Sequence, residues 1–137
     1  MGLGKTIQVL ALLQARRLRR LAPGEQRRPS IVVVPKSLVF NWIDEAARFT
    51  PRLRVADYTG LARELVLDQL DDCDVLVTTY GTLRRDIVKL KEIHFDYAIL
   101  DESQAIKNSD SQAAKACRLL RADHRLAMTG TPVENHL

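Results

Sequence analysis

Short apolar segments alternate along the chain with segments of amphipathic, helical spacing, and this alternation constrains the fold more than any other feature of the sequence. The clearest apolar segment, residues 31–34, is a run of Ile and Val that ends at Pro35, as expected of a strand buried on both faces. Further strands are predicted at residues 54–58, 75–78, 97–100 and 125–128. Alternating strands and helices are typical of an α/β fold, in which helices cover both faces of a mostly parallel sheet.

Segments with helical spacing lie between these strands. The predicted helices cover residues 5–21, 37–49, 61–70, 83–90 and 109–120. Five apolar residues of the first helix are expected on one buried stripe, namely Ile7, Leu10, Ala11, Leu18 and Leu21. Three local signals mark helix ends: Pro23-Gly24 after the first helix, Ser37 as the cap of the second, and a capping box of Ser109 with Gln112 before the last.

Trp42 in the second predicted helix has two possible roles. It shares an apolar stripe of helical spacing with Leu38, Ala46 and Phe49. This spacing favours a position in the core over a surface on which nucleic-acid bases stack.

The composition excludes several classes of protein. The 137 residues suffice for about one domain. The longest apolar run, residues 9–13, is far shorter than the roughly 20 residues of a membrane helix. Cys73 and Cys117 lack the spacing of a zinc finger or a disulfide framework. These observations predict an intracellular protein without a membrane partner, cytoplasmic in a bacterium or nuclear in a eukaryote.

The chain carries 21 basic and 17 acidic residues, a net charge of +4. Six arginines crowd one segment: Arg16, Arg17, Arg19, Arg20, Arg27 and Arg28. Two interpretations stay open. The arginines form a solvated helix end, where cations interact with the negative end of the helix dipole, or they contact phosphate groups directly.

A phosphate-binding pattern stands at the beginning of the sequence. Gly2-Leu3-Gly4-Lys5-Thr6 matches the second half of a Walker A loop, and Gly4-Lys5-Thr6 leads directly into the first predicted helix. Backbone N–H groups and the positive end of the helix dipole are suited to a phosphate. Lys5 would reach the β- and γ-phosphates of ATP, and the Thr6 hydroxyl would bind Mg²⁺.

An acidic pair follows the strand predicted at residues 97–100. Asp101-Glu102 at the carboxyl end of an apolar strand is the Walker B arrangement. Asp101 would hold Mg²⁺, and Glu102 would orient and polarise the attacking water. Together with the phosphate-binding pattern, this pair predicts an ATP site.

The segment Asp-Glu-Ser-Gln-Ala-Ile-Lys-Asn at residues 101–108 resembles motif II of the superfamily 2 helicase-like ATPases, and its Ile-Lys-Asn tail resembles the Swi/Snf-type branch of double-stranded DNA translocases. Ser103 and Gln104 stand where many relatives carry other small residues and His, but both acids are intact. Four further blocks resemble motifs I, Ia, Ib and III of that branch in the same order: residues 1–6, residues 32–38 with Asn41-Trp42 and Glu45, residues 78–80, and residues 129–132 with Asn135.

This resemblance implies a RecA-like P-loop fold, a three-layer α/β sandwich with a mostly parallel sheet. Residues 1–137 would be part of the N-terminal ATP-binding lobe, without the strand that precedes the P-loop and without the second lobe. Gln104 would sense the γ-phosphate and pass its state to Thr129, Gly130 and Thr131. Contacts with DNA phosphates are implied for four residues: Lys36, Ser37, Thr79 and Thr82.

The resemblance therefore predicts an ATP- and Mg²⁺-dependent lobe of a double-stranded DNA translocase, with double-stranded DNA and a second RecA-like lobe as partners. On its own the chain is expected to hydrolyse ATP poorly, because the second lobe would supply an arginine finger. Two alternatives stay open. One is the lobe of a strand-separating helicase or restriction-type motor, and the other is a nucleotide-binding remnant without turnover.

Overall fold

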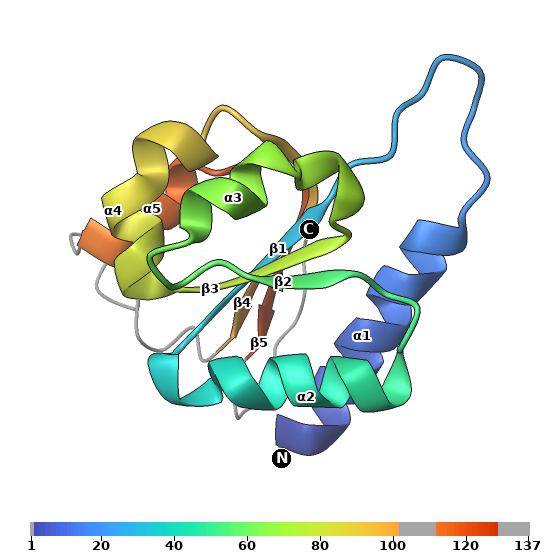
Figure 1. Cartoon of the computed structure of the whole chain (residues 1–137), viewed down its shortest axis with the longest axis horizontal. Helices are drawn as coiled ribbons and strands as arrows, with labels where there is room; N and C mark the ends of the chain where they lie inside the picture. The colour runs from blue at the N-terminus through green and yellow to red at the C-terminus, as the bar shows by residue number, and fades with distance from the viewer. Residues whose placement is uncertain (1, 102–111, 129–137) are drawn as a thin grey trace.

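Within residues 2–101 and 112–128, which the computed structural model describes, five strands pair in parallel in the order β2-β3-β1-β4-β5 (Figure 1). The strands are β1 Ser30–Val34, β2 Val55–Asp57, β3 Val75–Thr79, β4 His94–Asp101 and β5 Arg121–Met128. All five coincide with predicted strands, although β4 and β5 begin three and four residues earlier than predicted. The predicted α/β fold with a parallel sheet is confirmed.

Helices cover both faces of this sheet. They are α1 Gly2–Leu18, α2 Val39–Phe49, α3 Arg63–Asp68, α4 Tyr80–Leu90 and α5 Gln112–Leu119, with short 3₁₀ turns at Lys36–Leu38 and Leu70–Asp72. Helices α1 and α2 pack on one face, and α3, α4 and α5 pack on the other (Figure 1). The result is the three-layer arrangement that the alternation of segments predicted. No helix in the described ranges is long and apolar enough to cross a membrane.

Strand β1 is the centre of the core. It lies between β3 and β4, and its residues 31–34 are 0% exposed. Val32 and Val34 pack toward α1 and α2, whereas Ile31 and Val33 pack toward α4 and α5. A strand buried on both faces has no polar side, which is why this segment is an uninterrupted run of β-branched residues.

The first helix differs from its prediction in both bounds and buried face. It begins at Gly2 and ends at Leu18, well before Pro23. Beyond the helix, the guanidinium of Arg27 donates to the carbonyl oxygens of Arg16 and Arg19, at 3.0 Å each, and so satisfies one carbonyl of the last turn.

The apolar stripe predicted for this helix is wrong. Ile7 and Leu18 are 37% and 65% exposed, and the residues that pack on the sheet are Val9, Leu10 and Leu13. Only Leu10 belongs to both sets. The buried stripe is narrow because α1 meets a single face of the sheet.

The second helix confirms one expectation and corrects two. Trp42 is 2% exposed and belongs to the core. Ser37 does not cap the helix, because a 3₁₀ turn occupies Lys36–Leu38 and the N-cap residue, Leu38, makes no side-chain cap hydrogen bond. Phe49 lies at the last position of the helix and is 51% exposed. The proposed capping partner Ser109 lies outside the described residues, and α5 begins at Gln112.

Candidate functional site

The carboxyl ends of the parallel strands meet at one edge of the sheet, and most of the predicted site residues follow those ends. Lys36 and Ser37 come just after β1, Thr79 is the last residue of β3, and Asp101 is the last residue of β4. Open α/β sheets bind their ligands at this edge. The sequence motifs are therefore brought together by strand direction.

The first turn of α1 lies at the same edge. Arg16, near the end of α1, bonds Asp96, near the start of β4. Helix α1 runs opposite to the strands (Figure 1). From Arg16 back to Thr6 is about 15 Å along a helix, and from Asp96 forward to Asp101 is about 17 Å along a strand. Because both distances start from one ion pair, Lys5 and Thr6 lie at the level of Asp101 rather than at the opposite end of the sheet.

Residues Gly2–Thr6 form the first helical turns of α1, so the two glycines are helical where a loop was predicted. Thr6 is 8% exposed, and Lys5 is half-buried. A side chain added at Gly4 would meet no atom within 4 Å. Core packing therefore does not require glycine at position 4. The open space at this helix N-terminus suits an anion, which the first N–H groups of a helix attract.

Asp101 is fixed by two hydrogen bonds. Its Oδ2 accepts from the indole Nε1 of Trp42 at 2.7 Å, and its carbonyl oxygen accepts from the Tyr80 hydroxyl at 2.7 Å. The residue is 8% exposed. Among the described residues, no donor bonds Oδ1. One carboxylate oxygen is thus held and the other is open, which fits the oxygen ligand that Mg²⁺ prefers.

The role of Trp42 was the feature that sequence reasoning missed. The residue was expected either in the core or as a stacking surface, and it is in the core but with its N–H aimed at the carboxylate of Asp101. A buried tryptophan needs a partner for its N–H, and this requirement indicates that a partner exists, although it does not indicate which acceptor it is.

Five predicted site residues lie outside the described residues. They are Glu102, Gln104, Thr129, Gly130 and Thr131. Their predicted roles in catalysis and coupling stay predictions. The strands that lead to them are described, and Asp101 of β4 is in register with Met128 of β5.

A groove of about 650 Å³ opens at the same edge, where β1, β2 and β3 end. Strand β1 leads into α2 on one face of the sheet and its neighbour β3 leads into α4 on the other, so the two connections diverge above the edge. Lys36, Thr79 and Thr82 all line the groove, together with Arg85, whereas Ser37 is exposed nearby and does not line it.

Thr79 and Thr82 mainly build the N-terminus of α4. The Thr79 hydroxyl accepts from the backbone N–H of Thr82 at 3.2 Å and donates to the Thr82 hydroxyl at 3.1 Å. Thr82 is 2% exposed. Of the four residues implied to contact DNA, Thr82 is the one whose hydroxyl is not accessible, because it is used inside the helix cap.

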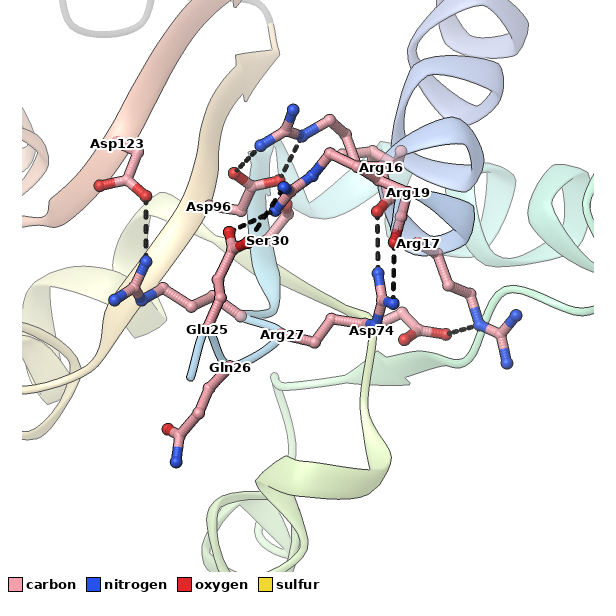
Figure 2. A pocket seen from close by; sticks show the side chains of 12 residues that line it. Arg16, Arg17, Arg19, Glu25, Gln26, Arg27, Ser30, Asp74, Asp96 and Asp123 are labelled. Atoms are coloured by element: carbon pink, nitrogen blue, oxygen red, sulfur yellow. Dashed lines mark hydrogen bonds and ion pairs between the residues drawn. The ribbon is translucent and has the colours of Figure 1, made fainter. Parts of the chain in front are cut away.

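The arginine-rich segment lies at the opposite, amino edge of the sheet, and neither interpretation drawn from the sequence holds in full. Figure 2 shows Arg16, Arg17 and Arg19 turned toward carboxylates of the same chain, whereas Arg27 is turned toward backbone carbonyl oxygens. Arg16 makes a two-pronged ion pair with Asp96 at 2.8 Å, Arg17 bonds Asp74 at 2.9 Å, and Arg28 pairs with Asp123 at 3.4 Å.

Asp74 is the most enclosed carboxylate of this cluster. It also accepts from the backbone N–H and the guanidinium of Arg54, at 2.8 to 3.2 Å. Burial alone would raise the Asp74 pKa, but the hydrogen bonds from Arg54 and the charges of Arg54 and Arg17 outweigh it, so the pKa lies below its usual value. The arginines that meet these acids are structural cations. They join α1 and the loop after it to the starts of β3, β4 and β5.

The two cysteines do not form a reactive site. Burial raises the pKa of Cys73 to about 11, and the charge of Asp74 adds to the effect. Burial likewise raises the pKa of Cys117 to about 11. At Cys73 burial raises the pKa more than the neighbouring charge of Asp74 does.

Comparison with known proteins identifies the family. A model of the SNF2-related domain matches residues 1–137. The TATA-binding protein-associated factor MOT1 of Saccharomyces cerevisiae is 37% identical over 146 residues, which cover 100% of this chain and 8% of MOT1. The putative ATP-dependent helicase/translocase YwqA of Bacillus subtilis is 36% identical over 140 residues, which cover 100% of this chain and 15% of YwqA.

A solved structure agrees with these matches. The SWI2/SNF2 ATPase core of Sulfolobus solfataricus in complex with dsDNA superposes with a TM-score of 0.82 at 38% identity, over 96% of this chain and 26% of that one. The chain thus spans a small part of its relatives, and the resemblance to Swi/Snf-type ATPases seen in the sequence is confirmed. This chain belongs to the SNF2-related domain family.

Proposed function

We propose that this chain is part of the first RecA-like lobe of an ATP-driven motor that moves on double-stranded DNA. The observation that carries the proposal is the meeting of three features at one sheet edge. These features are the first turn of α1 with Lys5 and Thr6, the carboxylate of Asp101, and the groove beside Lys36. The family of the chain and the DNA-bound structure of the Sulfolobus relative support the same proposal.

The nucleotide would lie against the start of α1. Lys5 would neutralise the β- and γ-phosphates, while Thr6 and Asp101 would hold Mg²⁺ through a hydroxyl and a carboxylate oxygen. When bound, the magnesium ion would supply electrostatic stabilisation of the charge that develops on the phosphoryl oxygens. Glu102 would orient the attacking water, and Gln104 would report the state of the γ-phosphate to Thr129, Gly130 and Thr131.

The groove would hold the phosphate backbone of one DNA strand. Lys36 and Arg85 supply positive charge. Ser37 supplies an exposed hydroxyl group beside the groove, whereas Thr79 lines the groove with a hydroxyl that already donates to Thr82. Contacts of this kind position a duplex without reading its bases. A second RecA-like lobe would complete the nucleotide site, and the coupled movement of two lobes would pull the DNA.

The test is the ATPase activity of the complete protein that carries this chain, measured with and without blunt double-stranded DNA. We expect duplex DNA to stimulate hydrolysis, with no strand displacement from a partial duplex. Lys5→Ala should abolish nucleotide binding, whereas Lys91→Ala, a change of an exposed lysine at the end of α4, should leave binding and turnover unchanged.

The alternatives predict different results. Displacement of a labelled strand would indicate a strand-separating helicase instead. ATP binding without turnover at any DNA concentration would indicate a nucleotide-binding remnant. Either result would overturn the proposal of a duplex DNA translocase.

A further inference from the structure

Asp101 is held by two residues that come from different layers of the molecule. The indole of Trp42, in α2, bonds its side chain, and the phenol of Tyr80, at the start of α4, bonds its carbonyl oxygen. Helix α2 lies on one face of the sheet and α4 on the other. The end of β4 is therefore clamped between the two helices that diverge above the sheet edge.

Both contacts come from helices that form the wall of the groove, although Trp42 itself does not line it. Tyr80 itself lines the groove, and so do Phe40 and Ile43, which flank Trp42 in α2. Trp42 is 2% exposed and packs in the core cluster with Val34 and Ile99, so its ring has little freedom to turn independently of the helix. A displacement of either groove wall would be transmitted to Asp101 through one side chain.

From this arrangement we propose that Trp42 and Tyr80 are positioning residues that link occupancy of the groove to the geometry of the metal-binding carboxylate. The inference rests on the proposed function, since it takes Asp101 as the magnesium ligand and the groove as the DNA site. It adds a physical connection between the two sites that does not pass through Gln104 or residues 129–131.

The hydrogen bond from Trp42 has a direct chemical consequence. With Oδ2 engaged by the indole N–H, Oδ1 is the oxygen presented to a cation, and the carboxylate cannot rotate without breaking the bond. Hydrogen bonds to a metal ligand from outside the coordination sphere fix its orientation, and their loss costs about 10- to 100-fold in metal affinity or activity. Tyr80 acts on the main chain of the same residue and should have a smaller effect.

The experiment measures metal binding directly in the complete protein. The affinity of Mn²⁺ in the presence of ADP is determined by electron paramagnetic resonance, with and without blunt duplex DNA, for the native protein and for Trp42→Phe. Phenylalanine keeps an aromatic ring and removes the N–H. We expect Mn²⁺ affinity to fall about tenfold and its response to DNA to be lost, while DNA affinity without nucleotide stays unchanged.

Two further variants keep the test decisive. Tyr80→Phe removes only the hydroxyl, so it should fold even if Trp42→Phe does not, and we expect Mn²⁺ affinity to fall about threefold with a weakened response to DNA. Phe49→Leu is the matched control, because it changes an exposed aromatic residue at the other end of α2. It should leave Mn²⁺ affinity and the DNA response at native values.

The outcomes separate this inference from the proposed function. If the native protein binds Mn²⁺ with ADP and is stimulated by DNA, but a folded Trp42→Phe and Tyr80→Phe both behave as the native protein does, the link between groove and carboxylate is overturned and the motor function stands. If the native protein neither hydrolyses ATP nor responds to DNA, the proposed function fails first, and the inference fails with it.

Discussion

The two edges of the sheet carry similar kinds of charged residues but use them in opposite ways. At the amino edge, Arg16 and Arg17 are paired with buried carboxylates of the same chain. At the carboxyl edge, Lys36 makes no ion pair within the described residues, and Asp101 has one oxygen that accepts no hydrogen bond from them. At the first edge Arg16 and Arg17 are neutralised within the chain, whereas at the second edge Lys36 and one oxygen of Asp101 are available to a ligand.

This difference shows why a count of positive charges is a poor guide to a ligand site. A phosphate contact was one of two interpretations of the densest cluster of arginines, yet Arg16 and Arg17 belong to a structural network around Asp74 and Asp96. The sparser cations at Lys36 and Arg85 are the ones that line a groove. Position relative to strand direction separates the two cases, because parallel strands place ligand-binding connections at their carboxyl ends.

The largest effect is expected from Glu102→Gln, a change at the residue that follows Asp101 in the sequence. Loss of the group that orients water should reduce kcat by about 10³-fold, while ATP binding is retained and the free energy of unfolding is unchanged. Single-turnover kinetics and nucleotide binding in the complete protein measure the two effects. The control is Glu92→Gln, a change of an exposed acid after α4. A loss of ATP binding in Glu102→Gln would contradict the assigned role.

Acidic pH should protonate carboxylates at the amino edge of the sheet and so lower the free energy of unfolding. Hydrogen bonding with His94, together with the charges of His94 and Arg28, lowers the pKa of Asp123, and the arginines around Asp74 lower its pKa despite burial. A lowered folded pKa means that the stabilisation is complete above the unfolded value of about 4 and is lost as pH falls through the folded pKa. Urea unfolding between pH 7 and pH 3 should show a free energy of unfolding that declines below about pH 4.

The substitution Asp74→Asn tests the same edge at one position. It leaves Arg17 and Arg54 without their anionic partner. The carboxylate that is removed is buried, whereas both arginines are partly exposed. We expect the free energy of unfolding to fall by about 2 kcal/mol, less than for a fully buried pair, with KM for ATP unchanged. Asp44→Asn, at an exposed pair within α2, should cost only about 0.3 kcal/mol. Equal losses in the two variants would contradict the contrast between enclosed and exposed pairs.

The sequence was sufficient to predict the central strand because burial on both faces leaves a direct pattern. Residues 31–34 predicted a central strand, and Asp101 could be located because it directly follows the strand predicted at residues 97–100. The buried faces of the helices were harder to predict. The spacing of α1 allowed several apolar stripes, and only packing against β1 and β4 selects Val9, Leu10 and Leu13.

Contacts between distant segments could not be predicted from one sequence. The bond from Trp42 to Asp101 joins residues 59 apart, and the pair of Arg16 with Asp96 joins residues 80 apart. Nothing in the local pattern records which buried donor meets which acceptor. The strand order brings β1 beside β4, and this tertiary fact decides both contacts.

The smallest effect should come from Lys36→Ala, the change that tests whether the carboxyl edge binds DNA at all. Lys36 is exposed at the groove and is unpaired among the described residues, so its removal costs no internal ion pair. One lost phosphate contact should weaken duplex binding by about fivefold and reduce the slope of log affinity against log salt by about 1. The matched control is Arg17→Ala at the amino edge, which should lower stability and leave that slope unchanged, because the Arg17 guanidinium is bonded to Asp74. If Arg17→Ala changed the slope and Lys36→Ala did not, DNA would bind the amino edge of the sheet instead of the carboxyl edge.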